Sequence, residues 1–176
     1  KGEYKRYLNT DTGVSPLTFA PDKDAIVKVN SYEHDEYGIT TEDPNITVAM
    51  QDKRLGKERF LAKDIESYSD AVKVYGNKRS KTALLCWGSN KGVCVEAAEK
   101  LGLKVIQPLV LWPFPINRFR AAVKGTNRII AVENNATGQL VRLLNNYGLK
   151  VDKMILKYDR RPFSLDELES KVKEAT

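Results

Sequence analysis

From residue 71 onward, short apolar runs alternate with stretches of helical hydrophobic spacing, and this alternation limits the possible folds more than any other feature. The predicted strands are AVKVYG (71–76), TALLCWG (82–88), LKVIQPLVL (103–111), NRIIAVEN (127–134) and LKVDKMILKYD (149–159). The predicted helices are SNKGVCVEAAEKLG, INRFRAAVKG, NATGQLVRLLNNYG and LDELESKVKEA. Strand–helix–strand units of this length form right-handed crossovers. The sequence therefore predicts an α/β fold with a doubly wound, mostly parallel sheet and helices on both faces.

Residues 1–70 have a different pattern. The first part is polar and rich in turn-forming residues, which predicts an extended arm. A short strand is predicted at AIVKVN (25–30), followed by an acidic loop. Asp43 and Pro44 have the order of an N-cap and a first helical residue, so they predict the start of a long charged helix. We expect two parts: the arm, loop and linker helix over 1–70, and the α/β domain over 71–176.

The charge balance does not favour nucleic acid as a partner. The formal net charge is +6, but lysine and arginine are mixed with acids, as in KRLGKERFLAKDIE, and this is typical of a solvated face. No apolar run approaches the roughly 20 residues that a membrane span needs, and the basic, polar N-terminus does not resemble a signal peptide. We expect a cytoplasmic protein, with a composition seen in thermophiles. Because the chain starts at Lys1 rather than methionine, we interpret it as part of a longer polypeptide.

The two cysteines, Cys86 and Cys94, lack the C-x-x-C spacing of a zinc or redox site. One lies in an apolar run and the other in a helical pattern, so we expect two buried free thiols. Iron–sulfur clusters usually need four cysteines, and the sequence therefore predicts no cluster on this chain.

Ligands of doubly wound sheets bind where strands end, and three segments qualify: 88–92, 113–115 and 133–138. WGSNKG has the position of a phosphate-binding turn but neither G-x-G-x-x-G nor the Walker spacing, so a tight strand-to-helix turn is favoured over nucleotide binding. In ENNATGQL, Asn135 or Thr137 could cap the next helix, while Gly138 would allow another backbone to approach. A binding role and a domain-contact role both stay open there.

The single histidine, His34, lies in the acidic run EHDEYG. These residue types suit a metal, but their spacing does not, because neighbouring side chains of an extended segment point in opposite directions. A loop that docks on another domain or subunit is preferred to metal binding or acid–base catalysis.

Several motifs together resemble the C-terminal part of the α subunit of 2-oxoacid:ferredoxin oxidoreductases, and the 2-oxoglutarate type is the most similar. They are GVSP (13–16), EHDEYG with ITTEDP (33–44), MQDKRLGK (50–57), WGSNKG (87–92), ENNATGQL (133–140) and KYDRRPF (157–163). Residues 82–147 also resemble the C-terminal domain shared by transketolases and pyruvate dehydrogenase β subunits.

The resemblance implies a complex that decarboxylates a 2-oxoacid on thiamine diphosphate and Mg²⁺, transfers the acyl group to coenzyme A and reduces ferredoxin through iron–sulfur clusters. It places these cofactors on other domains or subunits, so no catalytic, cofactor-binding or metal-binding residue is assigned here. The implied partners are the missing N-terminal domain of the same subunit, the β subunit and ferredoxin. The candidate docking residues are His34, Asp35, Glu36, Asn135, Thr137, Gly138 and Gln139. The alternatives are a stand-alone α/β module that binds a small ligand or nucleotide, and a basic nucleic-acid-binding protein.

Overall fold

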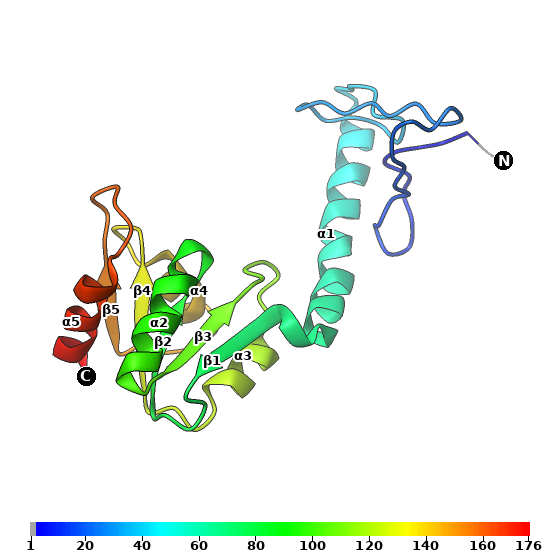
Figure 1. The fold of residues 1–176 in the computed structure, drawn as a ribbon. Coiled ribbons are helices and arrows are strands. Elements are labelled where there is room, and N and C mark those ends of the chain that lie inside the picture. The colour runs from blue at the N-terminus through cyan, green and yellow to red at the C-terminus, as the bar shows by residue number, and fades with distance from the viewer. Residues whose placement is uncertain (1–2) are drawn as a thin grey trace. The chain divides into compact units, whose positions relative to one another are not determined.

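The computed structural model describes residues 3–176, so the first two residues of the predicted arm lie outside it. The chain divides into two compact units, Lys1–Asp64 (unit 1) and Ile65–Thr176 (unit 2). Figure 1 shows the elements of each unit. The sequence places a boundary six residues later, at 70/71, and the roles assigned to the two parts remain predictions.

Unit 2 contains the predicted sheet, with five strands in the order β1-β3-β2-β4-β5. The strands are β1 (Val72–Gly76), β2 (Thr82–Cys86), β3 (Lys104–Pro108), β4 (Arg128–Glu133) and β5 (Lys153–Leu156). Strands β3, β2, β4 and β5 are parallel, and β1 pairs antiparallel with β3 along one edge. The expectation of a mostly parallel sheet is confirmed.

Helices cover both faces of the sheet (Figure 1). The helices of unit 2 are α2 (Lys91–Leu101), α3 (Ile116–Val123), α4 (Gln139–Asn145) and α5 (Leu165–Ala175). Side chains of α2 and α5 share one core cluster with Leu84 and Val105, and side chains of α3 and α4 share the other with Leu85 and Ile106. Consecutive strand residues thus face opposite cores, as expected for a sheet buried on both sides.

Residues typical of helix ends mark the end of α2 and the start of α5 in unit 2. Gly102, after α2, has φ of 67°, a left-handed conformation that favours glycine. The hydroxyl of Ser164 accepts a hydrogen bond from the Glu167 amide (3.2 Å) at the start of α5, so Ser164 is the N-cap of this helix. The Glu167 carboxylate pairs with Lys157, so it does not form the second hydrogen bond of a capping box, to the Ser164 amide.

Unit 1 is irregular except for α1, which runs from Pro44 to Ser67 and so continues three residues into unit 2. Asp43 Oδ1 accepts hydrogen bonds from the amides of Asn45 (2.8 Å) and Ile46 (3.0 Å), which confirms Asp43 as the N-cap. The strand predicted at 25–30 is wrong, because that segment has no regular secondary structure. Among residues 3–64, the one β pairing is the isolated bridge between His34 and Thr40, so the segment has no neighbouring strand.

Unit 1 has a very small hydrophobic core. Among residues 3–64, Met50 is the one buried hydrophobic side chain, and it lies on α1. Many large apolar side chains of this unit are exposed; those of the arm and loop are Val14, Leu17, Phe19, Ile26, Val27, Val29, Tyr32 and Ile39. An exposed apolar set of this size is typical of a surface that meets another protein.

Candidate functional site

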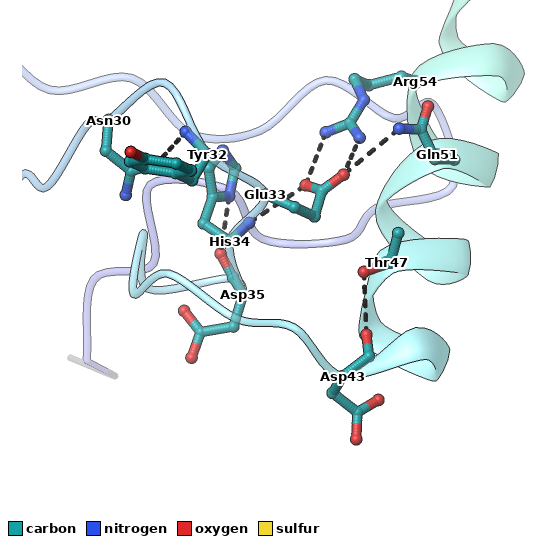
Figure 2. A network of polar contacts seen from close by, with 9 residues as sticks. All are labelled: Asn30, Tyr32, Glu33, His34, Asp35, Asp43, Thr47, Gln51 and Arg54. Atoms are coloured by element: carbon teal, nitrogen blue, oxygen red, sulfur yellow. Dashed lines mark hydrogen bonds and ion pairs between the residues drawn. The ribbon is translucent and has the colours of Figure 1, made fainter.

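The acidic loop of unit 1 is held to α1 by Glu33. Its carboxylate forms a bidentate pair with the Arg54 guanidinium, with Oε1 3.1 Å from Nη1, and also accepts from Gln51 Nε2 (3.4 Å). Figure 2 shows Arg54 and Gln51 on one face of α1 pointing at Glu33. The hydrogen bonds from Arg54 are the main reason that the pKa of Glu33 lies below its usual value. Glu33 is therefore a structural anion rather than an acid–base catalyst.

His34 and Asp35 stabilise the turn of the loop. The His34 ring stacks on Tyr7 with centroids 3.7 Å apart, its Nδ1 donates to the Asp35 carbonyl oxygen (3.2 Å), and only 8% of the residue is exposed. Asp35 Oδ1 accepts from the amides of Tyr37 (2.9 Å) and Ile39 (3.0 Å). These contacts use His34 Nδ1 and Asp35 Oδ1 inside unit 1, and Figure 2 shows His34 and Asp35 in this turn.

Glu36 ties the loop to the arm. Its carboxylate accepts from the Asn9 amide (2.6 Å) and pairs with Lys5 Nζ (2.7 Å), while its carbonyl oxygen accepts from the Tyr7 amide (2.9 Å). The Asn9 hydrogen bond first, and the Lys5 pair second, hold the pKa of Glu36 below its usual value. Glu36 and His34 thus join the acidic loop to the arm, while Asp35 holds the turn of the loop itself.

The pKa shifts of Glu33 and Glu36 give a pH prediction. A carboxylate whose pKa is lowered by folding stabilises the folded state above its usual pKa, about 4.5, and that contribution is lost as the pH falls through the lower folded value. We expect the arm and loop of unit 1 to loosen below pH 4.5, with a loss of amide protection at Asn9.

In Arg54→Gln, NMR titration should show the Glu33 pKa rising toward its usual value. The Glu36 pKa should stay unchanged, which makes it the internal control; an unchanged Glu33 pKa would refute the assignment.

In unit 2, the segment after β4 surrounds the buried carboxylate of Glu133. This residue is completely inaccessible to solvent. Its Oε2 accepts from Trp87 Nε1 (3.2 Å), Asn135 Nδ2 (2.8 Å) and the Leu140 amide (2.9 Å), and its Oε1 accepts from the Val141 amide (3.3 Å). Buried charge is tolerated where hydrogen bonds satisfy it in this way. Glu133 therefore joins the ends of β2 and β4 to the first turn of α4.

The other candidates of this turn have separate roles. Asn135 Oδ1 accepts from the amides of Thr137 (3.0 Å) and Gln139 (3.3 Å), so Asn135 supplies the predicted capping group. The side chains of Thr137 and Gln139 are exposed, and they remain the accessible candidates for docking at this turn.

Gly138, one of the candidate docking residues, is not accessible to a partner. Gly138 is buried and has φ of 61°, a left-handed conformation. A Cβ added there would lie 2.8 Å from Met154 Sδ on the neighbouring strand β5. The close approach that the glycine allows is therefore within unit 2, and Gly138 is a packing residue.

Sequence reasoning did not identify the network that holds this turn. It singled out Asn135, Thr137, Gly138 and Gln139, and it missed Glu133 as the central acceptor, together with Trp87 as its donor. The available signal was an acidic residue at the end of an apolar strand, directly before a helix whose first amides need acceptors. Asn90 also belongs here, because it is 5% exposed and its Nδ2 donates to the Val132 carbonyl oxygen (3.4 Å).

The donor atoms of the described residues do not fit a metal centre or an iron–sulfur cluster. Residues 3–176 contain no group of three His, Cys, Asp or Glu side chains close enough to hold a metal ion. Cys86 and Cys94 are free and fully buried in one core cluster, as predicted. A hydrogen bond with Cys86, and then burial, hold the pKa of Cys94 far above its usual value, so this sulfur stays a thiol.

The fold and the site thus define unit 2 as a doubly wound α/β domain with a closed polar network at one edge. No family model matches the chain. Its curated relatives include the 2-oxoacid:ferredoxin oxidoreductase α subunit of Saccharolobus solfataricus (38% identical over 97% of this chain and 28% of that protein). A second is the 2-oxoacid:ferredoxin oxidoreductase 2 α subunit of Aeropyrum pernix (34%, over 97% and 27%). The chain therefore spans about a quarter of the length of the curated relatives it matches.

A solved structure resembles the chain over 99% of its length. It is the 2-oxoglutarate:ferredoxin oxidoreductase from Magnetococcus marinus, determined with 2-oxoglutarate, coenzyme A and succinyl-CoA bound. The TM-score is 0.70, the sequence identity is 26%, and the match covers 31% of that chain.

Among the residues that the structure describes, no helix has both the length and the apolar character to cross a membrane.

Proposed function

We propose that this chain is the C-terminal part of the α subunit of a 2-oxoacid:ferredoxin oxidoreductase that acts on 2-oxoglutarate. The observation that carries the proposal is the 38% identity over 97% of the chain to an α subunit of this kind. The fold match to a 2-oxoglutarate enzyme supports the substrate. The reaction is the oxidative decarboxylation of the 2-oxoacid to an acyl-CoA, with electrons passed to ferredoxin.

Within such a complex, the chain holds domains and subunits together. Unit 1 supports this role because its apolar side chains, such as Phe19 and Ile26, are each 77% exposed while its acidic loop is rigidly tied by Glu33 and Glu36. In unit 2, the exposed Thr137 and Gln139 stand on a turn fixed by buried hydrogen bonds. Rigid turns with exposed side chains are well suited to protein contacts.

The cofactors of the reaction belong to other parts of the complex in this proposal. Thiamine diphosphate and Mg²⁺ lie between the missing N-terminal domain and the β subunit, and the clusters lie elsewhere. The support from this chain is chemical: its two thiols are buried, and the carboxylate of Glu133 is already saturated by four N–H groups.

An activity assay tests the proposal. The purified 176-residue chain should not reduce a viologen dye when 2-oxoglutarate, thiamine diphosphate, Mg²⁺ and coenzyme A are supplied. The intact α subunit that contains this chain, co-expressed with its β subunit, should do so. Pyruvate and a branched-chain 2-oxoacid serve as substrate controls. Turnover by the chain alone, or no 2-oxoacid-dependent reduction by the intact complex, would show the proposal to be wrong.

A further inference from the structure

The loop after β5 brings two arginines of KYDRRPF to the point where the sheet reverses its strand order. From β2 the chain crosses to β3 on one side and then to β4 on the other, so the carboxyl ends of β2 and β4 flank the reversal. Strand β5 runs parallel to β4, and Asn134 Nδ2 donates to the Arg161 carbonyl oxygen (3.3 Å). Figure 1 shows the segments after β4 and β5 at the same edge of the sheet. Ligands of doubly wound sheets bind at such a reversal.

A cavity of about 400 Å³ opens there, inside unit 2. Its lining is basic and polar, with one aromatic ring: Ser89, Asn134, Lys157, Tyr158, Arg160, Arg161 and Pro162. Ser89 comes from WGSNKG, the turn that the sequence placed where a phosphate could bind. The structure thus brings together parts of three motifs that are far apart in the sequence.

The cations of this cavity are not equivalent. Lys157 Nζ pairs with Glu167 and lies 3.7 Å from Asp159, so its charge is balanced within the chain. Among residues 3–176, neither the Arg160 nor the Arg161 guanidinium has a hydrogen-bond or carboxylate partner. Two unpaired guanidinium groups therefore lie beside a hydroxyl and an amide, and this combination suits an anion with several oxygens.

The backbone of Arg160 adds an independent observation. Its φ of 67° is the one positive value among the non-glycine residues of the described part of the chain. A left-handed conformation is disfavoured for a side chain of this size, and such strain gathers at functional positions. Glycine would suit the local backbone better. The arginine therefore indicates a use for its charged side chain and hydrogen-bond donors at this position.

We propose that this cavity is a binding site for a diphosphate-bearing ligand. The Arg160 and Arg161 guanidinium groups bind the phosphate oxygens, and the Ser89 hydroxyl and Asn134 amide complete the hydrogen bonds. Tyr158, 71% exposed, is placed to stack on a base when the ligand is a nucleoside diphosphate. The site is independent of the proposed role in the oxidoreductase complex.

Calorimetric titration of the 176-residue chain with inorganic pyrophosphate and with ADP, at low ionic strength, tests the proposal. Both probes should bind saturably, and Arg160→Gly and Arg161→Gln should each weaken binding at least about tenfold, because each removes charge-assisted hydrogen bonds. Arg142→Gln, on the exposed face of α4, removes the same charge elsewhere and should leave binding unchanged. Equal affinities for the two probes would identify a diphosphate group as sufficient, and tighter binding of ADP would identify a nucleoside diphosphate.

Thermal denaturation separates binding from structure. Glycine suits the left-handed backbone at position 160, so Arg160→Gly should melt at or above the temperature of the unmodified chain while losing affinity. No saturable binding by the unmodified chain would overturn the proposal, as would equal losses in all three variants. Tighter binding of an Asp/Glu-rich peptide than of pyrophosphate would also overturn it, because the cavity would then be a docking site for an acidic protein segment.

Discussion

Glu133→Gln is expected to lower the free energy of unfolding of unit 2 by about 2–3 kcal/mol, a large effect for a change of one atom. The carboxylate accepts from four N–H groups in the absence of solvent. A glutamine amide has one acceptor oxygen and an NH₂ group that would face a donor, so at least one buried donor loses its partner. The charge that strengthens the remaining hydrogen bonds is also removed.

Urea denaturation, followed by tryptophan fluorescence and circular dichroism, measures this effect. Glu99→Gln provides the matched control, because Glu99 is an exposed glutamate of α2 and its neutralisation should change stability by less than about 0.5 kcal/mol. The emission of Trp87 should also change in Glu133→Gln alone, since its indole N–H donates to Glu133. Equal stability of the two variants would show that the network contributes little.

Gly138→Leu is expected to destabilise unit 2 by about 2–3 kcal/mol, because a bulky side chain at a positive φ is strained and also meets Met154. This is the result expected of a buried packing residue and not of an accessible docking residue, the role that the sequence suggested for Gly138. The two causes can be separated. Gly102 has nearly the same φ, 67°, but open space around it, so Gly102→Ala measures the backbone effect alone.

Urea denaturation of Gly138→Ala, Gly102→Ala and the double variant Gly138→Ala/Met154→Ala completes the comparison. The contact with Met154 should make Gly138→Ala the more destabilising of the two alanine changes, and truncating Met154 should remove most of the difference. Because Met154 is 53% exposed and flexible, this difference should be less than about 1 kcal/mol. An unfolding free energy of Gly138→Leu equal to that of the unmodified chain would restore Gly138 as a candidate docking residue.

The fold of unit 2 was predictable because its signals are local and repeated. Apolar runs such as TALLCWG and helix-ending residues such as Gly102 act over a few positions, and all five strands follow from them with only their ends shortened. The failed strand at 25–30 shows the limit of this reasoning. A β-branched run forms a strand only where a neighbouring strand offers hydrogen bonds, and no such strand lies within residues 3–64.

The contacts of the candidate sites depend on which segments meet, and the sequence pattern does not contain that information. The loop EHDEYG was expected to dock on another domain or subunit. The hydrogen bonds that the structure shows for it are to Arg54 on α1 and Asn9 in the arm, which are separated from it by about twenty residues or more. The orientation of Gly138 and the burial of Glu133 likewise follow from the crossing of β4, β5 and α4. The residue types indicate which segments are polar. The topology determines which of these polar side chains contact each other.

The small core of unit 1 has a consequence for the order of folding. Among residues 3–64, Met50 is the one buried hydrophobic side chain, whereas unit 2 has two core clusters. Under the proposed docking role, unit 2 can fold by itself, while the arm of unit 1 buries little apolar surface until a partner covers its exposed side chains. In a free copy of the chain a protease would then cut the arm first, so the arm would act as a quality check on complex formation.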